Sequence, residues 1–242
     1  MKIMTSLQRC GCYATMIGLV AWGTAVANAQ LANGLLDLTS PGSQLGATPT
    51  GWTVTASRSI SGTFNDGASS EGFANFAAPS GNGLFFKPFQ GNATDGNITV
   101  HLFQDNPGTP GLQYSLTGYA GAEANYSGFI AASPTRSEFA LEFLDAGSIV
   151  IGSSVLDLEV AGLGTPNANP FNYAQYSLIA TAPAGTASVR ARASMIDAFN
   201  NPAGGGQAFV VDVFELTVVP EPGTFALIGM GLLGLLAIRR KK

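Results

Sequence analysis

The sequence predicts an all-β fold, an antiparallel sandwich or barrel, and three observations support this prediction. Apolar residues alternate with polar ones at a period of two wherever a pattern is readable in the body of the chain. Turn signals rich in glycine, proline, asparagine and aspartate separate these stretches at short intervals. Charged residues make up only 11% of the chain, against about 25% in an average domain, which suits an exported β protein with tight turns better than a helical enzyme.

The chain begins with the features of a secretory signal peptide in residues 1–29. A positively charged start precedes a mostly apolar stretch, Tyr13–Val26, and the small residues Ala27 and Ala29 stand at the two positions that signal peptidase reads. These features predict a signal helix, cleavage before Gln30 and export from the cytoplasm. A retained transmembrane helix is the alternative, but the apolar stretch is shorter than the ~20 residues needed to span a bilayer.

The body that remains, residues 30–219, is predicted to be one domain without disulfides. Cys10 and Cys12 both lie in the segment to be removed, so the stability of the mature protein has to come from a packed core. The body holds five Lys and Arg against fourteen Asp and Glu, a net charge of −9. Because it offers no basic patch, we expect no nucleic-acid partner.

Period-two alternation places strands along the whole body. Residues 137–153 read as a hairpin with one buried face, in which Glu138 and Glu142 lie on the outward face. Arg190 and Arg192 likewise point outward between apolar neighbours on a later strand. The other strand candidates are residues 51–57, 59–64, 83–91, 97–105, 112–121, 173–182, 187–195 and 207–219.

Catalytic residues are scarce in this body. His101 is the only histidine, and no cysteine remains after export, so neither a catalytic triad nor a histidine-built zinc site can be assembled. Glu138 with Glu142, or Asp157 with Glu159, could pair for glycoside hydrolysis. Residues two or four apart on a strand share one face, however, whereas glycosidase carboxylates normally flank a cleft from different elements. We therefore predict that the protein is not an enzyme, and keep a glycan hydrolase as the alternative.

The body resembles a carbohydrate-binding module of the galactose-binding-domain-like class over most of residues 31–218. The residues that carry the resemblance are "NGLLDL" (33–38), "GW" (51–52), "ALEFLDAGSIVIGS" (140–153) and "AFVVDVFEL" (208–216). The resemblance implies a single antiparallel β-sandwich with jelly-roll topology. It also implies a binding role.

Members of that class often bring their two ends together around a structural calcium ion. The corresponding carboxylates here are Asp37 and Asp212, although Leu36 replaces the usual aromatic residue and the last strand has one aspartate where two are common. Calcium takes six to eight oxygen ligands, so backbone carbonyls would have to complete the site. The resemblance thus implies calcium near Asp37 and Asp212, and the alternative is a solvated or hydrogen-bonded Asp212.

Sugar binding by such a fold requires exposed aromatic rings beside polar side chains. The candidates are Tyr119, Tyr126, Phe171 and Tyr173, each near an asparagine in the sequence. The alternative for each is packing within the core or across strands.

The C-terminal segment, residues 220–242, consists of three elements in a fixed order. Pro220, Glu221 and Pro222 come first, and an apolar run of 15 residues, Thr224–Ile238, follows. As a helix this run rises about 22 Å, short of a hydrocarbon core of about 30 Å, and the prolines prevent its extension. Four cations end the chain and would stay in the cytoplasm under the positive-inside rule: Arg239, Arg240, Lys241 and Lys242.

This arrangement resembles the PEP-CTERM sorting signal over residues 219–242. The resemblance implies a Gram-negative-type envelope and cleavage near the triplet by an exosortase, after an inner-membrane intermediate held by a short transmembrane helix. The known substrates of that system are linked to surface display, extracellular polysaccharide and biofilm formation. A permanent single-span anchor is the alternative.

Together these features predict an exported, exosortase-sorted protein of the cell surface or extracellular matrix, with a non-catalytic β-sandwich. Its expected partners are signal peptidase, exosortase, extracellular polysaccharide and, transiently, the membrane. The alternatives are an exported glycan hydrolase and a permanently anchored structural protein.

Overall fold

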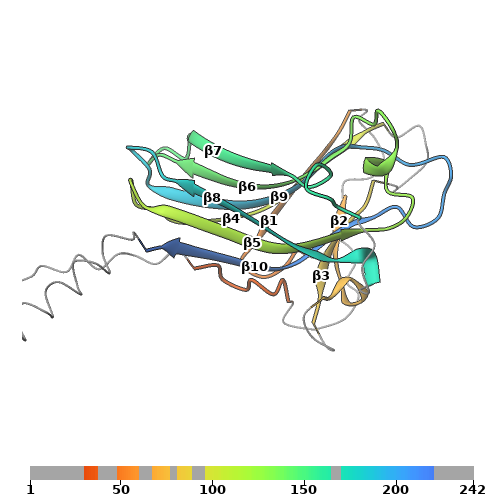
Figure 1. Cartoon of the computed structure of the whole chain (residues 1–242), viewed down its shortest axis with the longest axis horizontal. Helices are drawn as coiled ribbons and strands as arrows, with labels where there is room; N and C mark the ends of the chain where they lie inside the picture. Colours follow the sequence, from red (N-terminus) through yellow and green to blue (C-terminus); the bar gives the residue numbers. More distant parts are fainter. Residues whose placement is uncertain are drawn as a thin grey trace, which may run out of the picture.

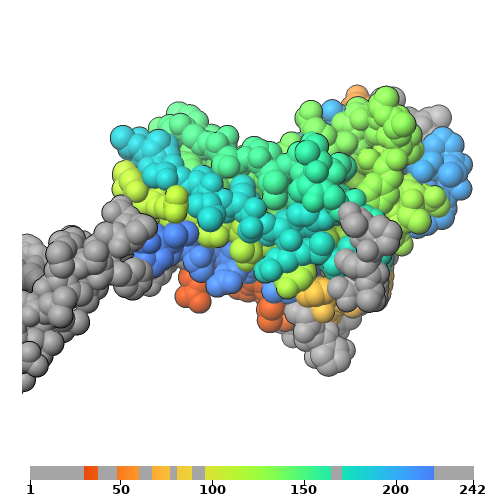
Figure 2. All heavy atoms as spheres, viewed as in Figure 1, coloured from red at the N-terminus to blue at the C-terminus, as the bar shows by residue number. Residues whose placement is uncertain are grey.

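The computed structural model describes residues 30–37, 48–59, 67–76, 81–88, 96–164 and 170–220 of the 242. Two antiparallel sheets face each other and form an elongated body, with β10 (Phe209–Val219) running to one end (Figures 1 and 2). The described residues hold short 3₁₀ turns but no α-helix. The all-β sandwich prediction is therefore confirmed, and the two flanking helices lie outside the described residues.

One sheet has the strand order β1-β4-β9-β6-β7 and the other β2-β3-β10-β5-β8. Sequence neighbours are thus often separated in space, as expected for a sandwich with crossovers between sheets. The strands of the first sheet are β1 (Thr53–Arg58), β4 (Ile98–Pro107), β9 (Ser188–Ala198), β6 (Arg136–Leu144) and β7 (Val150–Asp157). Besides β10, the second sheet contains β2 (Ala68–Glu71), β3 (Gly83–Phe86), β5 (Gln113–Ala122) and β8 (Ala174–Thr181).

The main core fills the space between the sheets with the inward half of each alternating strand. Phe139 on β6 lies opposite Ala193 on β9, which lies opposite Leu102 on β4, so large and small side chains alternate across one row. All three are completely buried. Because successive strand residues point to opposite faces, this row fixes which residues of the same strands face solvent.

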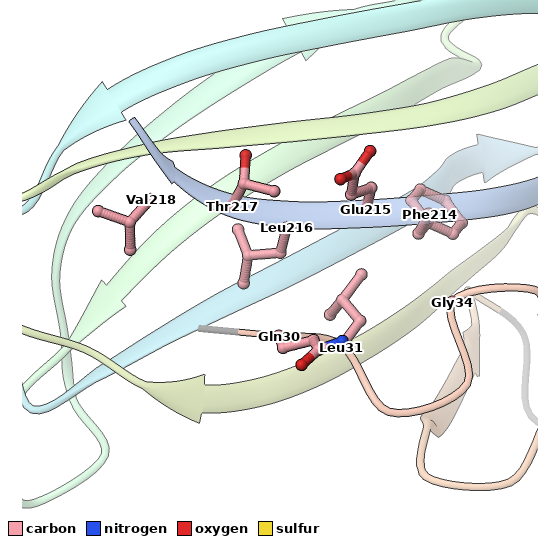
Figure 3. Close-up of a pocket in the computed structure, with 8 residues that line it drawn as sticks. All are labelled: Gln30, Leu31, Gly34, Phe214, Glu215, Leu216, Thr217 and Val218. Carbon is pink, nitrogen blue, oxygen red and sulfur yellow. The ribbon is translucent and has the colours of Figure 1, made fainter. Parts of the chain in front are cut away.

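The two ends of the described domain lie beside each other. Gln30 and Leu31 share a hollow of about 420 Å³ with β10 residues Phe214–Val218 (Figure 3). The main-chain N–H of Phe214 donates a 2.7 Å hydrogen bond to the carbonyl of Gly34, which holds the first segment along β10. The start and the finish of the domain are therefore neighbours.

Most of the predicted sorting and processing residues fall outside the described part of the chain. Pro220 is described and is exposed directly after β10. The other residues predicted to act in sorting or processing lie outside the described residues: Ala27, Ala29, Glu221, Pro222, Arg239, Arg240, Lys241 and Lys242. Within the described ranges, no helix has the length and apolar character needed to cross a bilayer.

Candidate functional site

A groove runs over the outer face of the β1-β4-β9-β6-β7 sheet. The groove encloses about 440 Å³ and extends from Ile196, which pairs with Arg136 at the start of β6, to Val150, which pairs with Leu144 at its end. The middle strands supply most of its lining because their outward positions carry charged and aromatic residues. The full lining is Thr55, His101, Phe103, Glu142, Val150, Arg190, Arg192 and Ile196.

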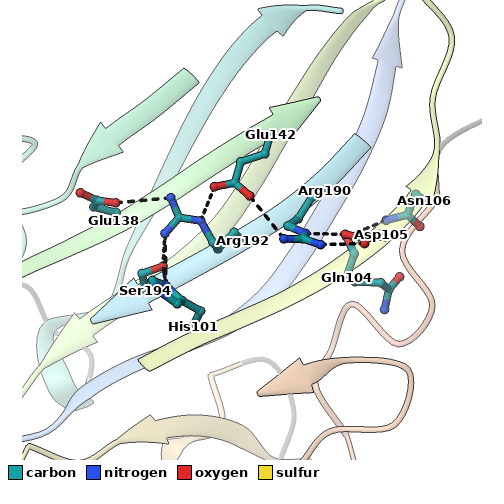
Figure 4. Close-up of polar contacts among 9 residues, drawn as sticks. All are labelled: His101, Gln104, Asp105, Asn106, Glu138, Glu142, Arg190, Arg192 and Ser194. Carbon is teal, nitrogen blue, oxygen red and sulfur yellow. Dashed lines mark hydrogen bonds and ion pairs between the residues drawn. The ribbon is translucent and has the colours of Figure 1, made fainter. Parts of the chain in front are cut away.

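Arg192 occupies the centre of this groove and joins β9 to β6 (Figure 4). Its Nε donates a 2.8 Å hydrogen bond to Oε1 of Glu142, and its Nη2 lies 3.5 Å from Oε2 of Glu138. Its Nη1 donates to the hydroxyl of Ser194 on the same strand. All three partners lie on the same outward face, so the guanidinium is held in place from β6 and β9.

Arg190 forms the second charged contact of the groove. Its Nε and Nη2 donate to the two carboxylate oxygens of Asp105 at 2.6 and 2.9 Å, a bidentate pair across the β4–β9 register. Its Nη1 lies 3.7 Å from Oε2 of Glu142, and its guanidinium covers the ring of Phe103 at 4.1 Å. Hydrogen bonding to Asp105 raises the pKa of Arg190, which remains cationic.

His101 lies in the same row, and among the described residues no carboxylate is hydrogen-bonded to it. Its Nδ1 lies 2.7 Å from the hydroxyl of Ser194, and Arg192 is beside it. Partial burial, with a further contribution from the Arg192 charge, lowers the pKa of His101, so the imidazole is neutral at pH 7. Glu138 and Glu142, the carboxylate pair considered for hydrolysis, both turn toward Arg192.

Three of the four aromatic residues predicted to bind sugar gather on the outer face of the other sheet. Phe76 stacks on Tyr119 with ring centroids 4.0 Å apart and also contacts Tyr173 at 5.3 Å, while Phe171 lies 6.0 Å from Tyr173. Tyr173 is only 2% exposed and donates its hydroxyl to the carbonyl of Ala74 at 2.5 Å. Burial, together with the charge of a nearby carboxylate, raises its pKa. Tyr173 therefore packs rather than presenting its ring to solvent.

Tyr126 differs most from the sequence expectation. It is completely buried in the main core, its ring stacks on Phe209, and its hydroxyl lies 2.7 Å from that of Ser137. Because its ring is buried, Tyr126 cannot contact a sugar at the surface, and the prediction that it binds sugar is wrong for this arrangement. The 3₁₀ turn that follows it, Ser127–Phe129, directs the chain so that Tyr126 points inward.

The carboxylates of Asp37 and Asp212 accept hydrogen bonds from main-chain N–H groups. Oδ2 of Asp212 accepts from the N–H of Phe76 at 2.7 Å, its Oδ1 accepts from the N–H of Val213 at 2.7 Å, and Oδ1 of Asp37 accepts from Asn82 N–H at 2.9 Å. Among the described residues, no three acidic, histidine or cysteine side chains gather as a metal group. Calcium at this place would need backbone carbonyls besides the two carboxylates, and the calcium site stays a prediction.

The sequence pointed to few of the groove residues as a site. Arg190 and Arg192 were predicted to face outward, and they do, but their partners Asp105 and Glu142 lie 85 and 50 residues away in the chain. Phe103 has no sequence signal beyond its outward position in the alternation. Strand order and register are needed to bring these residues together.

Comparison with known proteins identifies one motif and a fold. Residues 218–241 match the family known as the PEP-CTERM protein-sorting motif. No curated protein matches the chain in sequence. The chain is thus a β-sandwich protein that carries a PEP-CTERM sorting motif.

Several solved structures are similar to this chain at low sequence identity. The cyclase Fisc from Fischerella sp. TAU, solved with an indole ligand, has a TM-score of 0.50 and 12% identity over 80% of this chain and 98% of its own. Tailspike protein 4 of bacteriophage CBA120 has a TM-score of 0.47 and 12% identity; the match covers 76% of this chain but only 22% of the tailspike chain. The module TmCBM61, solved with β-1,4-galactotriose, has a TM-score of 0.40 and 12% identity over 70% of this chain and 90% of its own. Of these, the likeness to the cyclase, at a TM-score of 0.50, concerns the fold alone.

Proposed function

We propose that this protein is exported, sorted through its C-terminal motif by an exosortase, and binds extracellular polysaccharide without catalysis through the groove over the β1-β4-β9-β6-β7 sheet. The groove is the observation that carries the binding role. It is open to solvent and its lining reaches from Ile196 to Val150, so a polymer chain can lie along it. A closed pocket would instead favour a single small molecule.

The groove offers hydrogen-bonding groups in a fixed arrangement. Guanidinium donors, carboxylate acceptors, the hydroxyl of Thr55 and the neutral imidazole of His101 lie within one surface. The ion pairs hold Arg190 and Arg192 in place before a ligand arrives, which lowers the entropic cost of ordering them on binding. Phe103 adds an apolar ring beneath Arg190.

The charge balance favours a neutral polysaccharide. Arg190 and Arg192 are offset by Asp105, Glu138 and Glu142, so the groove presents no surplus positive charge for an anionic polymer. The body as a whole carries −9. An acidic glycan would be repelled at long range, especially at low ionic strength.

Binding is tested with the mature protein against a panel of soluble neutral and acidic polysaccharides. We expect binding to a neutral polymer, and a loss of at least about tenfold for Arg190→Gln or His101→Asn. Arg136→Ala is the matched control, because Arg136 is another arginine of this sheet and its side chain is 55% exposed outside the groove lining. A reducing-sugar assay runs alongside, and turnover would replace the binding role with the hydrolase alternative.

Sorting is tested by the intact mass of the protein recovered from its host. A mass that ends near Pro220 supports cleavage after export. Full retention of residues 224–242 would replace exosortase sorting with the permanent anchor. This measurement does not depend on whether the groove binds sugar.

A further inference from the structure

The end of the sandwich at which β10 finishes carries an exposed apolar tip. Ile149, Val150 and Ile151 are consecutive and are 64%, 47% and 37% exposed. The turn that follows β8 packs beside them, since a Cβ on Gly152 would lie 3.1 Å from Cγ of Pro183. We call Ile149, Val150, Ile151 and Pro183 the apolar tip.

The position of the tip follows from the strand register. Val150 pairs with Leu144, whose carbonyl accepts from Ala187, so this hairpin adjoins the turn after β8. The same turn bonds to Leu112, which directly precedes β5, and the first β5 residue pairs with Val219. Figure 2 shows these segments gathered at one end of the body. The tip and the last residue of β10 therefore belong to the same end of the molecule.

This end is almost free of charge. Its turns, residues 108–112, 145–149 and 182–187, together with 217–220, contain one charged residue, Asp145. The carboxylate of Asp145 is engaged in its own turn, where Oδ1 accepts from the N–H groups of Gly147 and Ile149 at 2.8 and 2.9 Å. The opposite end carries Glu123, Asp157, Glu159 and Asp197 beside Arg58 and Arg136, so acidic residues outnumber basic ones there.

The short connection between β10 and the apolar run limits which surface this end of the domain can contact. Val219 is the last strand residue, and only four residues separate it from the 15-residue apolar run Thr224–Ile238. Four extended residues reach about 14 Å. While that run sits in a bilayer, the end of β10 cannot move far from the headgroups, and the tip moves with it.

We propose that the apolar tip rests in the interfacial region of the phospholipid bilayer while the C-terminal segment is still attached. The tip offers aliphatic side chains to the headgroup and acyl boundary. The surplus of carboxylates at the other end disfavours contact of that end with anionic lipid. The inference rests on the proposed membrane-inserted intermediate, but not on sugar binding.

The experiment uses the full chain in vesicles of phosphatidylethanolamine and phosphatidylglycerol. With Cys10 and Cys12 replaced by serine, no other cysteine remains, so one environment-sensitive fluorophore can be placed by Ile149→Cys. Val160→Cys is the matched control, since Val160 is 86% exposed in the turn at the opposite end. Phe225→Cys reports insertion of the apolar run.

Brominated lipids are expected to quench the fluorophore at 149 at least twofold more than at 160. Quenching at 225 with equal, weak values at 149 and 160 overturns the tip proposal while leaving the inserted segment intact. Absence of quenching at 225 contradicts the membrane intermediate and the tip together. If Ile149→Ser with Val150→Ser slows processing in cells although the label at 149 is not quenched in vesicles, the tip contacts a membrane protein and the bilayer proposal fails.

Discussion

Glu159 makes the stability of the sandwich depend on pH in an unusual direction. It lies in the turn after β7, where its Oε2 accepts a 2.8 Å hydrogen bond from the N–H of Ser137. Its Oε1 is buried and, among the described residues, has no hydrogen-bond donor. Burial raises the pKa of Glu159 to about 7 despite the bonds from Ser137, and the nearby charge of Asp157 adds to the rise.

The sign follows from proton linkage. The folded state binds the proton more tightly than the unfolded chain, in which a solvated glutamate has its ordinary pKa of 4.5. The free energy of unfolding therefore falls as the pH rises from about 4.5 to about 7. Above about pH 7 the charged Glu159 destabilises the folded state by the full amount. The shift corresponds to at most about 3 kcal/mol, and screening of a partly exposed group reduces this to about 1–3 kcal/mol.

Urea unfolding of the wild type and Glu159→Gln at pH 5 and pH 8 measures this effect. The variant keeps an oxygen acceptor for Ser137 but has no charge, so its stability relative to the wild type should rise by about 1–3 kcal/mol between the two pH values. Glu215→Gln removes one exposed carboxylate from β10 and is the matched control. A difference between wild type and Glu159→Gln that stays constant with pH would refute the reasoning.

Three further changes have defined outcomes. Glu71→Gln leaves the buried ammonium of Lys87, 3.3 Å from the Glu71 carboxylate, without its counter-charge, and should lower the free energy of unfolding measured by urea titration by about 3 kcal/mol. Replacing both residues by Leu and Met should restore most of that free energy. Gly121→Ala would place a Cβ 2.3 Å from the carbonyl oxygen of Phe171 and should cost about 1–3 kcal/mol, while Gly147→Ala, which meets only a flexible carboxylate at 3.3 Å, should change little in the same titration. EDTA should leave the melting temperature unchanged because main-chain N–H groups already hold both oxygens of Asp212, and a drop of several degrees would instead support the calcium hypothesis.

The fold could be predicted from the sequence where side chains alternate on long strands. Glu138, Glu142, Arg190 and Arg192 were expected to face outward, and the structure confirms all four because an inward neighbour on each strand is fixed by the core. Alternation fails in β2, whose sequence "ASSE" is polar yet wholly buried. Its burial depends on Lys87, which neutralises Glu71 from a separate segment.

The candidate site could not be predicted because its residues come together only through the order of strands in the sheet. The sequence search favoured aromatic residues close to asparagine, but proximity along the chain does not decide whether a ring faces solvent. Tyr126 follows β5, where no alternation applies, and its turn directs it into the core. The groove instead joins β4, β6 and β9, which are adjacent only after the chain has crossed between sheets.

The groove and the apolar tip fix an orientation for the proposed function. The strands of the grooved sheet run from the tip toward the acidic end, and the groove lining extends along them from Val150, a tip residue, to Ile196. If the apolar tip rests in the bilayer interface, the groove therefore lies along the membrane normal. One end of the groove is then near the headgroups and the other faces the exterior. A polysaccharide bound before cleavage would be directed away from the membrane. Cleavage near Pro220 would then free a domain that already carries its ligand, and Arg190→Gln should lower capture of the polymer by at least about tenfold without changing the residue at which the released protein ends.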